Sequence, residues 1–344
     1  MPLIIPIFIP HEGCPHCCLF CNQHSISGCS APPVTGAAIG ETIRAWLARA
    51  RPEHRAQAQV AFYGGSFTGL SPARQTELLA AVQPFCAQNL VREVRLSTRP
   101  DYIDHQRLDL LIRHRVSIIE LGAQSCDDRV LRQSGRGHTA ADTAIAAGLI
   151  RERGLRLGLQ LMPGLPGEDF GSLRHTVAEV VHLRPDFVRL YPALVLRGSG
   201  LERLYHQGGY RPLSLGRAVL YTAFMKKRFD DQGIGVVRMG LQPTKELERS
   251  LVAGPYHPAF GELVKARLML RQTRQVLAGA RGATPVTLVI AARDHSIFRG
   301  LGSANLTRLR QLGLLDRFTL RSDPMQPRQT LRVAPAENPQ VVRG

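Results

Sequence analysis

Six short apolar runs, separated by longer amphipathic stretches, constrain the fold of this chain more than any other feature. Helical patterns such as Gly40–Arg49, Pro72–Ala87 and Thr139–Arg153 lie between the runs. Strands that are apolar along their whole length and alternate with helices are typical of a parallel sheet covered by helices, as in a full or partial barrel. The expected strands are Ile4–Pro10, Gln59–Tyr63, Val94–Thr98, Ile118–Ala123, Leu155–Met162 and Phe187–Ala193.

The pattern changes after about residue 200. We expect a long helix over Leu213–Gln232 and a further strand over Gly235–Leu241. We assign residues 1–250 to a core barrel and residues 251–344 to a small C-terminal α+β extension, whose last residues, Ala336–Gly344, lack periodicity and are expected to fray. The elements expected in the extension are helices Phe260–Ala280 and Asn305–Gly313 and strands Thr287–Ala291, Phe318–Arg321 and Thr330–Val333.

Four cysteines fall within eight residues, directly after the first expected strand. Soft thiolates select zinc or iron–sulfur clusters. Zinc knuckles are normally separated by a spacer of roughly 12–20 residues, which this loop lacks. A thioredoxin-like pair would normally open a helix as a single CxxC. The CxxxCxxC set Cys14, Cys18 and Cys21, with Phe20 before the last thiol, instead predicts a [4Fe–4S] cluster with one iron left open for another ligand.

The remaining cysteines and the histidines near this loop are assigned simpler roles. We expect Cys17 to be an unligated neighbour of the cluster. Cys29, Cys86 and Cys126 are expected to be packed small residues. His11 is expected to pack beside the loop, and His16 to be a solvated loop residue.

Together with this loop, four further segments resemble motifs of the radical S-adenosylmethionine (SAM) superfamily, in family order and over about residues 4–200. The resemblance is strongest to the branch that contains the Elongator catalytic subunit and oxygen-independent coproporphyrinogen III oxidase. The Elongator-like acetyltransferase domain is not expected, because too little chain remains for it. The segments are Tyr63–Thr68 (YGGSFT), Ser97–Asp101 (STRPD), Glu120–Ser125 (ELGAQS) and Gly158–Gly167 (GLQLMPGLPG), and Tyr191–Val195 and Leu201–Pro212 resemble the Elongator-like end of the core.

This resemblance implies a partial (βα)6 TIM-type barrel, an enzyme, and two cofactors: the [4Fe–4S] cluster and SAM. In that family the reduced cluster cleaves SAM to methionine and a 5′-deoxyadenosyl radical, with electrons from a flavodoxin- or ferredoxin-type donor. The backbone of the glycine-rich motif meets the methionyl amino group there. In this chain that role would fall to Gly64, Gly65, Ser66 and Phe67.

Polar residues inside the expected strands are further candidates for contact with the cofactor. Glu120 lies in an apolar run, where a carboxylate needs a partner: a ligand, or an arginine such as Arg95 or Arg99. Gln124 and Gln160 carry the same alternatives, with Gln124 expected to point into the barrel.

Two arginines and one loop were assigned by position alone. Arg189 is expected to point outward and to be structural. Arg238, with Gln242 close after it, is a candidate for the substrate side. The segment Gly254–Gly261 is too rich in turn residues for a helix, and is either a lid over the barrel or a rigid connector.

The chain carries a formal net charge of +17, and only four of its 44 basic residues are lysines. Arginine enrichment fits either phosphate binding or a GC-rich genome. From Glu262 to Gly344 there are 14 basic and 5 acidic residues, which favours a polyanion such as RNA or tRNA, or an acidic small substrate. No apolar run reaches the ~20 residues that span a bilayer, and the N-terminus lacks signal-peptide features, so we expect a cytoplasmic protein without a membrane partner.

Three functional hypotheses remain open from the sequence. The first is a radical SAM enzyme that acts on RNA. The second is a radical SAM enzyme that acts on an anionic small molecule such as a tetrapyrrole. The third is a non-catalytic protein that binds a cluster and has kept the fold.

Overall fold

The chain divides into two compact units, residues 1–258 and 259–344. The structure is a computed structural model, and it describes residues 3–9, 13–14, 18–22, 34–280 and 285–334. The predicted boundary lay between residues 250 and 251, a few residues before the observed division. The C-terminal stretch expected to fray lies outside the described residues.

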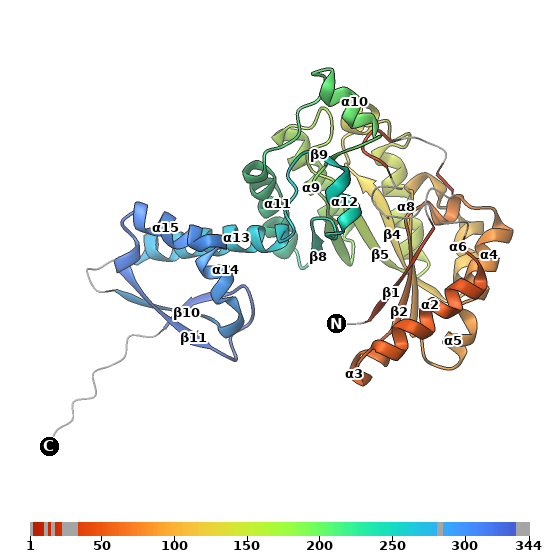
Figure 1. The fold of residues 1–344 in the computed structure, drawn as a ribbon, viewed down its shortest axis with the longest axis horizontal. Helices are drawn as coiled ribbons and strands as arrows, with labels where there is room; N and C mark the ends of the chain where they lie inside the picture. Colours follow the sequence, from red (N-terminus) through yellow and green to blue (C-terminus); the bar gives the residue numbers. More distant parts are fainter. Residues whose placement is uncertain (1–2, 10–12, 15–17, 23–33, 281–284, 335–344) are drawn as a thin grey trace. The chain divides into compact units, whose positions relative to one another are not determined.

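Unit 1 is built on a parallel sheet of seven strands that curls into a half-barrel (Figure 1). The predicted partial barrel is confirmed, and the strand expected after residue 235 joins the same sheet. All six neighbouring pairs in this sheet are parallel. The strands, in spatial order, are β1 (Ile4–Phe8), β2 (Gln59–Tyr63), β3 (Glu93–Thr98), β4 (Val116–Gln124), β5 (Arg156–Leu161), β6 (Phe187–Leu190) and β8 (Gly235–Met239).

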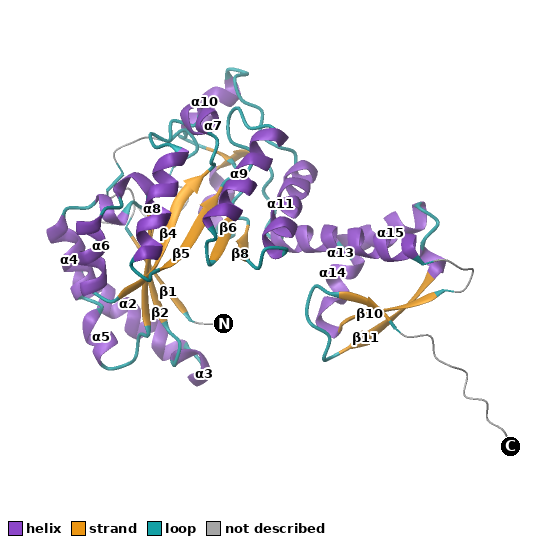
Figure 2. Ribbon diagram, turned by 180° about the vertical axis from the view of Figure 1, so that it is seen from behind, coloured by secondary structure: helices purple, strands orange, loops and turns teal. Residues whose placement is uncertain are grey.

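Helices cover the outer face of this sheet (Figure 2). Most start at a side-chain cap, as Ser71, Asp104, Thr139 and Ser214 show. Unit 1 also contains a separate short antiparallel pair, β7 (Val195–Leu196) with β9 (Leu251–Ala253). The helices are α2 (Gly36–Arg49), α3 (Pro52–Arg55), α4 (Pro72–Ala80), α5 (Gln83–Ala87), α6 (His105–Arg113), α7 (Asp128–Gln133), α8 (Ala140–Glu152), α9 (Phe170–Leu183), α10 (Gly200–His206), α11 (Leu215–Asp230) and α12 (Lys245–Ser250).

The single helix predicted over Pro72–Ala87 is wrong, because the segment forms two helices, α4 and α5. Pro84 lies in the first turn of α5. Proline has no backbone N–H and its ring clashes with the preceding turn, so it is tolerated at a helix start but breaks a helix interior. The chain therefore stops α4 at Ala80 and begins again at Gln83.

Side chains alternate along the strands between the helix-covered face and the barrel interior. On β4, Ile119, Leu121 and Ala123 belong to the apolar core under the helices, whereas Glu120 belongs to the opposite set. On β5, Leu157, Leu159 and Leu161 pack outward in the same way. The runs that look uniformly apolar in the sequence thus enclose a polar interior.

Unit 2 is a three-stranded sheet with helices on one face. Its strands lie in the order β11 (Phe318–Asp323), β10 (Val286–Ala291) and β12 (Leu331–Val333). The pair β10–β11 is parallel and β10–β12 is antiparallel. Leu288 and Ile290 of β10 pack under the helices, which are α13 (Phe260–Gly279), α14 (His295–Arg299) and α15 (Ala304–Gln311).

Asn305 fixes α15 within this unit. Its amide nitrogen donates to the carbonyl oxygens of Ala266, Ile297 and Phe298 at 2.9, 3.2 and 3.1 Å. The side chain is buried, so these carbonyls have little access to water. One amide therefore ties α13, α14 and α15 together.

None of the helices that the structure describes is both long and apolar enough to cross a membrane.

Asn305→Ala should destabilise unit 2 selectively. The substitution leaves buried carbonyls without a donor, and we expect a loss of about 1–3 kcal/mol in the free energy of opening. Amide hydrogen exchange should show faster exchange in α13, α14 and α15 and little change in the strands of unit 1. Thr307→Ala, at an exposed position of α15, is the control. Equal exchange in the two variants would contradict the role given to Asn305.

Candidate functional site

The cysteine loop follows β1 at the carboxyl end of the sheet, where barrel enzymes carry their chemistry. Close backbone packing fixes its start. Gly13 has a φ of +75°, and a Cβ there would lie 2.2 Å from the carbonyl oxygen of Ser66. A Cβ on Gly69 would meet the carbonyl oxygen of Gly13 at 2.1 Å. Only glycine at both positions lets the loop after β1 pack directly on the turn after β2.

Cys18 and its neighbours are held from two sides. The backbone N–H of Leu19 donates to Ser134 O at 3.0 Å, and Leu19 O accepts from the N–H of Leu201 at 2.7 Å. The side chain of Asn22 donates to the backbone oxygen of Arg197. The loop that carries the cysteines is therefore attached to the segment after β4 and to the start of α10.

Arg136 places positive charge at the cysteine loop. Its Nη1 lies 3.4 Å from Cys18 Sγ, and its Nη2 donates to the Gly122 carbonyl at the end of β4 at 2.5 Å. Burial raises the pKa of the Cys14 thiol, and a hydrogen bond with the Ser66 backbone and the charges of Arg136 and Arg99 act against that rise. These groups favour thiolates, the form in which cysteine binds metals.

Within the described residues, no three His, Cys, Asp or Glu side chains are gathered into a metal site. Cys14 and Cys21 are half-buried and Cys18 is buried. The candidates Cys17, His11, His16 and Cys29 lie outside the described residues. The assignment of Cys14, Cys18 and Cys21 to a cluster stays a prediction that rests on the donor set.

The glycine-rich turn after β2 provides open backbone beside β1. Gly64 has a φ of +95°, a conformation that glycine adopts without strain. Gly65 is half-buried beside it. Ser66 is buried, and its hydroxyl contacts Thr98 Oγ1 at 3.0 Å. Phe67 is fully buried with its ring 5.0 Å from that of Phe62, so its side chain supports the turn.

Two features of Gln124, its backbone conformation and its side-chain oxygen, are typical of ligand-binding residues. It is not a glycine, yet its φ is +67°, and the register between β4 and β5 shifts beside it. Its side-chain oxygen is buried and has no hydrogen-bond partner in the part of the chain that the structure describes. Backbone strain and an unsatisfied buried acceptor at the end of a barrel strand fit a donor group on a bound cofactor, such as an amino or hydroxyl group.

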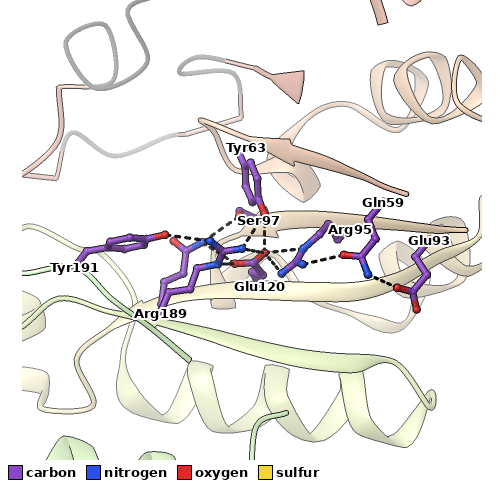
Figure 3. Close-up of polar contacts among 9 residues, drawn as sticks. Gln59, Tyr63, Glu93, Arg95, Ser97, Glu120, Arg189 and Tyr191 are labelled. Atoms are coloured by element: carbon purple, nitrogen blue, oxygen red, sulfur yellow. Dashed lines mark hydrogen bonds and ion pairs between the residues drawn. The ribbon is translucent and has the colours of Figure 1, made fainter. Parts of the chain in front are cut away.

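A charged network fills the barrel interior below this end (Figure 3). Glu120 has no exposed surface. Its Oε1 accepts from Arg95 Nε at 2.9 Å and from the Tyr63 hydroxyl at 3.1 Å. Its Oε2 accepts from Gln160 Nε2 at 3.3 Å and lies 2.6 Å from Arg189 Nε. Of the partners named for Glu120 from sequence, Arg95 is present, whereas Arg99 pairs with Asp101.

The outward orientation predicted for Arg189 is wrong. Its side chain is only 11% exposed and points into the network, where it reaches Glu120, the Tyr63 hydroxyl at 3.0 Å and the Tyr191 hydroxyl at 3.4 Å. Arg189 follows Val188, which packs outward, so strand alternation turns the arginine inward. Burial alone would lower the pKa of Arg189, but Glu120 and the two tyrosines raise it above its ordinary value, so Arg189 is charged.

This network engages two residues assigned to the cofactor from sequence. Both oxygens of Glu120 are already used by side chains of the protein. Gln160 donates to Ser97 Oγ at 3.1 Å as well as to Glu120. Contact of Glu120 or Gln160 with a cofactor stays a prediction, and their observed role is to hold strands β2 to β6 together beneath the glycine-rich turn.

Contact of Arg238 with a substrate stays a prediction, and its contacts in the structure are local. Arg238 folds back on its own loop, donating to Gly240 O and to the side chain of Gln242. The division between the two units falls inside Gly254–Gly261, which favours the connector interpretation of this segment. Cys86 and Cys126 are buried, as predicted, and burial raises the pKa of Cys126 to about 12.

The sequence interpretation missed Arg136 and His138. Both lie between α7 and α8, in the segment Gly135-Arg-Gly-His138. The available signal was an arginine between two glycines in the connection between two helices. Burial, with the charges of Arg136 and Arg99, lowers the pKa of His138 to about 3.

Breaking the Glu120 network from one side should be strongly destabilising. Glu120→Gln leaves Arg95 and Arg189 buried without their counter-charge, and we expect a loss of about 3–5 kcal/mol in the free energy of unfolding. When Arg189→Gln is added to Glu120→Gln, the further loss in the free energy of unfolding should be smaller than the loss caused by Arg189→Gln alone. The difference, measured by urea unfolding, should be about 1 kcal/mol or more. Glu77→Gln, which removes an exposed ion pair with Arg74, should change stability by less than about 1 kcal/mol. Additive effects of the two buried substitutions would refute the coupling.

Acidification should destabilise the protein through His138. The folded imidazole stays neutral down to about pH 3, whereas the unfolded one takes up a proton near pH 6.5. The stability from this residue is therefore present above pH 6.5 and lost as pH falls towards 3, on the order of 2 kcal/mol at pH 5. In urea unfolding between pH 7 and 5, His138→Leu should show a shallower decline than the unsubstituted protein. If the free energy of unfolding declined equally with pH in the two proteins, the role given to His138 would be contradicted.

Relatives of known name share part of this chain. A tRNA uridine(34) acetyltransferase of Methanocaldococcus jannaschii is 31% identical over 134 residues, which cover 38% of this chain and 25% of the relative. Human Elongator complex protein 3 is 32% identical over 128 residues, covering 35% of this chain and 23% of the relative. The chain thus matches about a quarter of these relatives. An uncharacterized protein of M. jannaschii, 29% identical over 214 residues, is covered to 64%.

Solved structures share the fold. The archaeal Elp3 of Methanocaldococcus infernus, with an N-terminal deletion, superposes with a TM-score of 0.61 at 19% identity, covering 78% of this chain and 63% of that one. At these identities the likeness shows the fold alone.

Two family profiles match in succession along the chain. The Radical SAM C-terminal domain matches residues 185–270. The Radical SAM superfamily matches residues 8–180, just over half of the chain. The superfamily match contains the cysteine loop, the glycine-rich turn and Glu120, whereas Arg189 of the Glu120 network lies in the C-terminal match. The chain belongs to the radical SAM superfamily and is an enzyme of that type, related to the Elongator branch.

Proposed function

We propose that this enzyme binds a [4Fe–4S] cluster through Cys14, Cys18 and Cys21 and cleaves SAM reductively. When bound, the cluster would supply the electron that turns SAM into methionine and a 5′-deoxyadenosyl radical. The observation that carries the proposal is the position of the three-thiol loop. It lies at the carboxyl end of β1, packed on the glycine-rich turn and beside the Arg136 guanidinium.

The residues of the chain have separable roles in this proposal. Arg136 would offset the negative charge of the thiolates. Gly64 and Gly65 would present backbone groups to SAM, and the unpaired oxygen of Gln124 would accept a hydrogen bond from it. The network around Glu120 would hold Tyr63, and hence the turn that follows it, in place. Precise placement of SAM against the substrate is the contribution that the protein makes to radical chemistry.

We propose RNA, and tRNA in particular, as the substrate class. Two observations support this assignment. Relatives that share the core are named as tRNA uridine(34) acetyltransferases and Elongator complex protein 3. The chain is strongly basic, with a net charge of +17. A cytoplasmic location and a flavodoxin- or ferredoxin-type electron donor belong to the same proposal.

A small anionic metabolite is the second candidate substrate. The observation that favours it is the charge of the barrel interior, where Arg95 and Arg189 face the single carboxylate of Glu120. One guanidinium charge in excess would suit a carboxylate or phosphate group. Saturable binding of such a metabolite, with no affinity for RNA, would favour this candidate.

Cys18→Ala should abolish SAM cleavage. After anaerobic reconstitution, the unsubstituted protein should hold roughly four irons per chain and form 5′-deoxyadenosine with dithionite and SAM. The variant should lose the absorbance of the cluster and form no 5′-deoxyadenosine above background. Cys86→Ala and Cys126→Ala remove buried thiols outside the loop and serve as controls. They should keep both iron and activity.

Two outcomes would count against this proposal. Iron retained by Cys18→Ala at the level of the unsubstituted protein would place the cluster elsewhere. Four irons bound without 5′-deoxyadenosine, with and without tRNA, would favour a non-catalytic cluster-binding protein.

A further inference from the structure

Three arginines form a stripe along the solvent side of α13. Arg267, Arg271 and Arg274 are all exposed, at spacings of four and three residues. With about 100° and 1.5 Å per residue, they fall within an arc of about 60° and span about 10 Å of the helix axis. We refer to these three residues as the α13 arginine stripe.

The stripe is electrostatically uncompensated. No hydrogen bond or ion pair joins its guanidinium groups to any residue that the structure describes. Nearby acids are used elsewhere in unit 2: Glu262 pairs with Lys265, Asp294 with Arg328 and Asp323 with Arg332. Like charges three and four residues apart on a helix repel each other and destabilise it.

The spacing of these three arginines on one helix distinguishes the stripe from the arginines of unit 1 that pair with acids. Examples of such pairs are Arg74–Glu77, Arg129–Asp169 and Arg153–Asp109. The stripe instead concentrates three unpaired cations on one helix face. The neighbouring helix α15 adds exposed Arg308 and Arg310 to the same layer, and Asn305 holds it on α13 (Figures 1 and 2).

The exposed face of α13 fits a phosphate backbone better than a lipid surface. Helices that lie in a membrane insert large apolar side chains below their basic face. Among the described residues of unit 2, the large exposed apolar side chains are Leu301, Met325 and Val333, and α13 carries none of them. By contrast, a nucleic-acid strand presents a phosphate about every 3.4 Å along the helix axis, so a stripe of about 10 Å can face about three phosphates.

We propose that the α13 arginine stripe docks the phosphate backbone of the RNA substrate. This rests on the proposed action on RNA and assigns the contact to a helix of unit 2, whereas the cysteine loop belongs to unit 1. The arginines supply affinity and orientation without reading sequence. Binding through them should therefore depend steeply on salt and little on base identity.

The test is tRNA binding by the full-length, reconstituted protein. Fluorescence anisotropy with an unmodified tRNA transcript, from about 50 to 200 mM KCl, gives the slope of log K against log salt. The triple variant Arg267→Gln, Arg271→Gln, Arg274→Gln should bind at least about tenfold more weakly, with a slope shallower by about 2–3.

A charge-matched triple provides the control. Arg174→Gln, Arg293→Gln, Arg321→Gln removes three exposed arginines outside the stripe, and its affinity should stay within about threefold of the unsubstituted protein. Equal losses in the two triples would overturn the proposal in favour of general charge, as would unaltered binding by the stripe variant. Absence of tRNA binding by the unsubstituted protein would overturn it too.

Failure of the stripe can be distinguished from failure of the proposed radical chemistry. Formation of 5′-deoxyadenosine without RNA should be equal in the stripe variant and the unsubstituted protein. If none of the proteins forms it, the proposed chemistry fails, while the comparison of affinities still decides the stripe. If an acidic protein such as α-casein competes with tRNA at equal charge concentration, the surface is a protein-binding one and the proposal fails.

Discussion

The barrel of unit 1 depends on one buried carboxylate. Glu120 accepts hydrogen bonds or ion pairs from side chains of β2, β3, β5 and β6, so that five neighbouring strands meet at a single charged group. A carboxylate in this position is stabilising only while its arginines remain, because each charge would otherwise be buried alone. The network also fixes Tyr63, the residue that precedes the glycine-rich turn. The same network therefore holds the curled sheet together and positions the candidate site.

Above that network, the carboxyl ends of the strands gather groups of complementary chemistry. Two glycines allow the cysteine loop and the turn after β2 to pack backbone to backbone. Arg136 links the loop to the end of β4. There Gln124 has a positive φ, and its side-chain oxygen has no partner among the described residues. Strain and an unpaired buried acceptor lower stability, and they persist where a ligand makes use of them. These features fit the proposal that a bound cofactor occupies this end of the sheet.

The charged side chains described above have different surroundings in the two units. In the interior of unit 1, two arginines meet one carboxylate at short range. On the surface of unit 2, α13 carries guanidinium groups that have no partner among the residues that the structure describes. The first arrangement is typical of structural support and the second of contact with a polyanion. An enzyme that acts on a large charged substrate needs both a dry interior for the chemistry and an outer surface that holds the substrate by its charges.

The sequence by itself determined the order and type of the sheet strands of unit 1 and of most of the long helices, because strand and helix periodicity is a local property. It did not predict the break between α4 and α5 or the short pair β7–β9. It also predicted the cluster loop, because the spacing of Cys14, Cys18 and Cys21 needs no tertiary information. Only the tertiary structure decided which side chains meet. Arg189 was expected to point outward, yet strand alternation and the curl of the sheet bring it to a carboxylate 69 positions earlier in the chain. Arg136 reaches Cys18 across 118 positions. Such contacts join residues that are distant in sequence and come near each other only after the sheet has formed and curled, so no local sequence pattern predicts them.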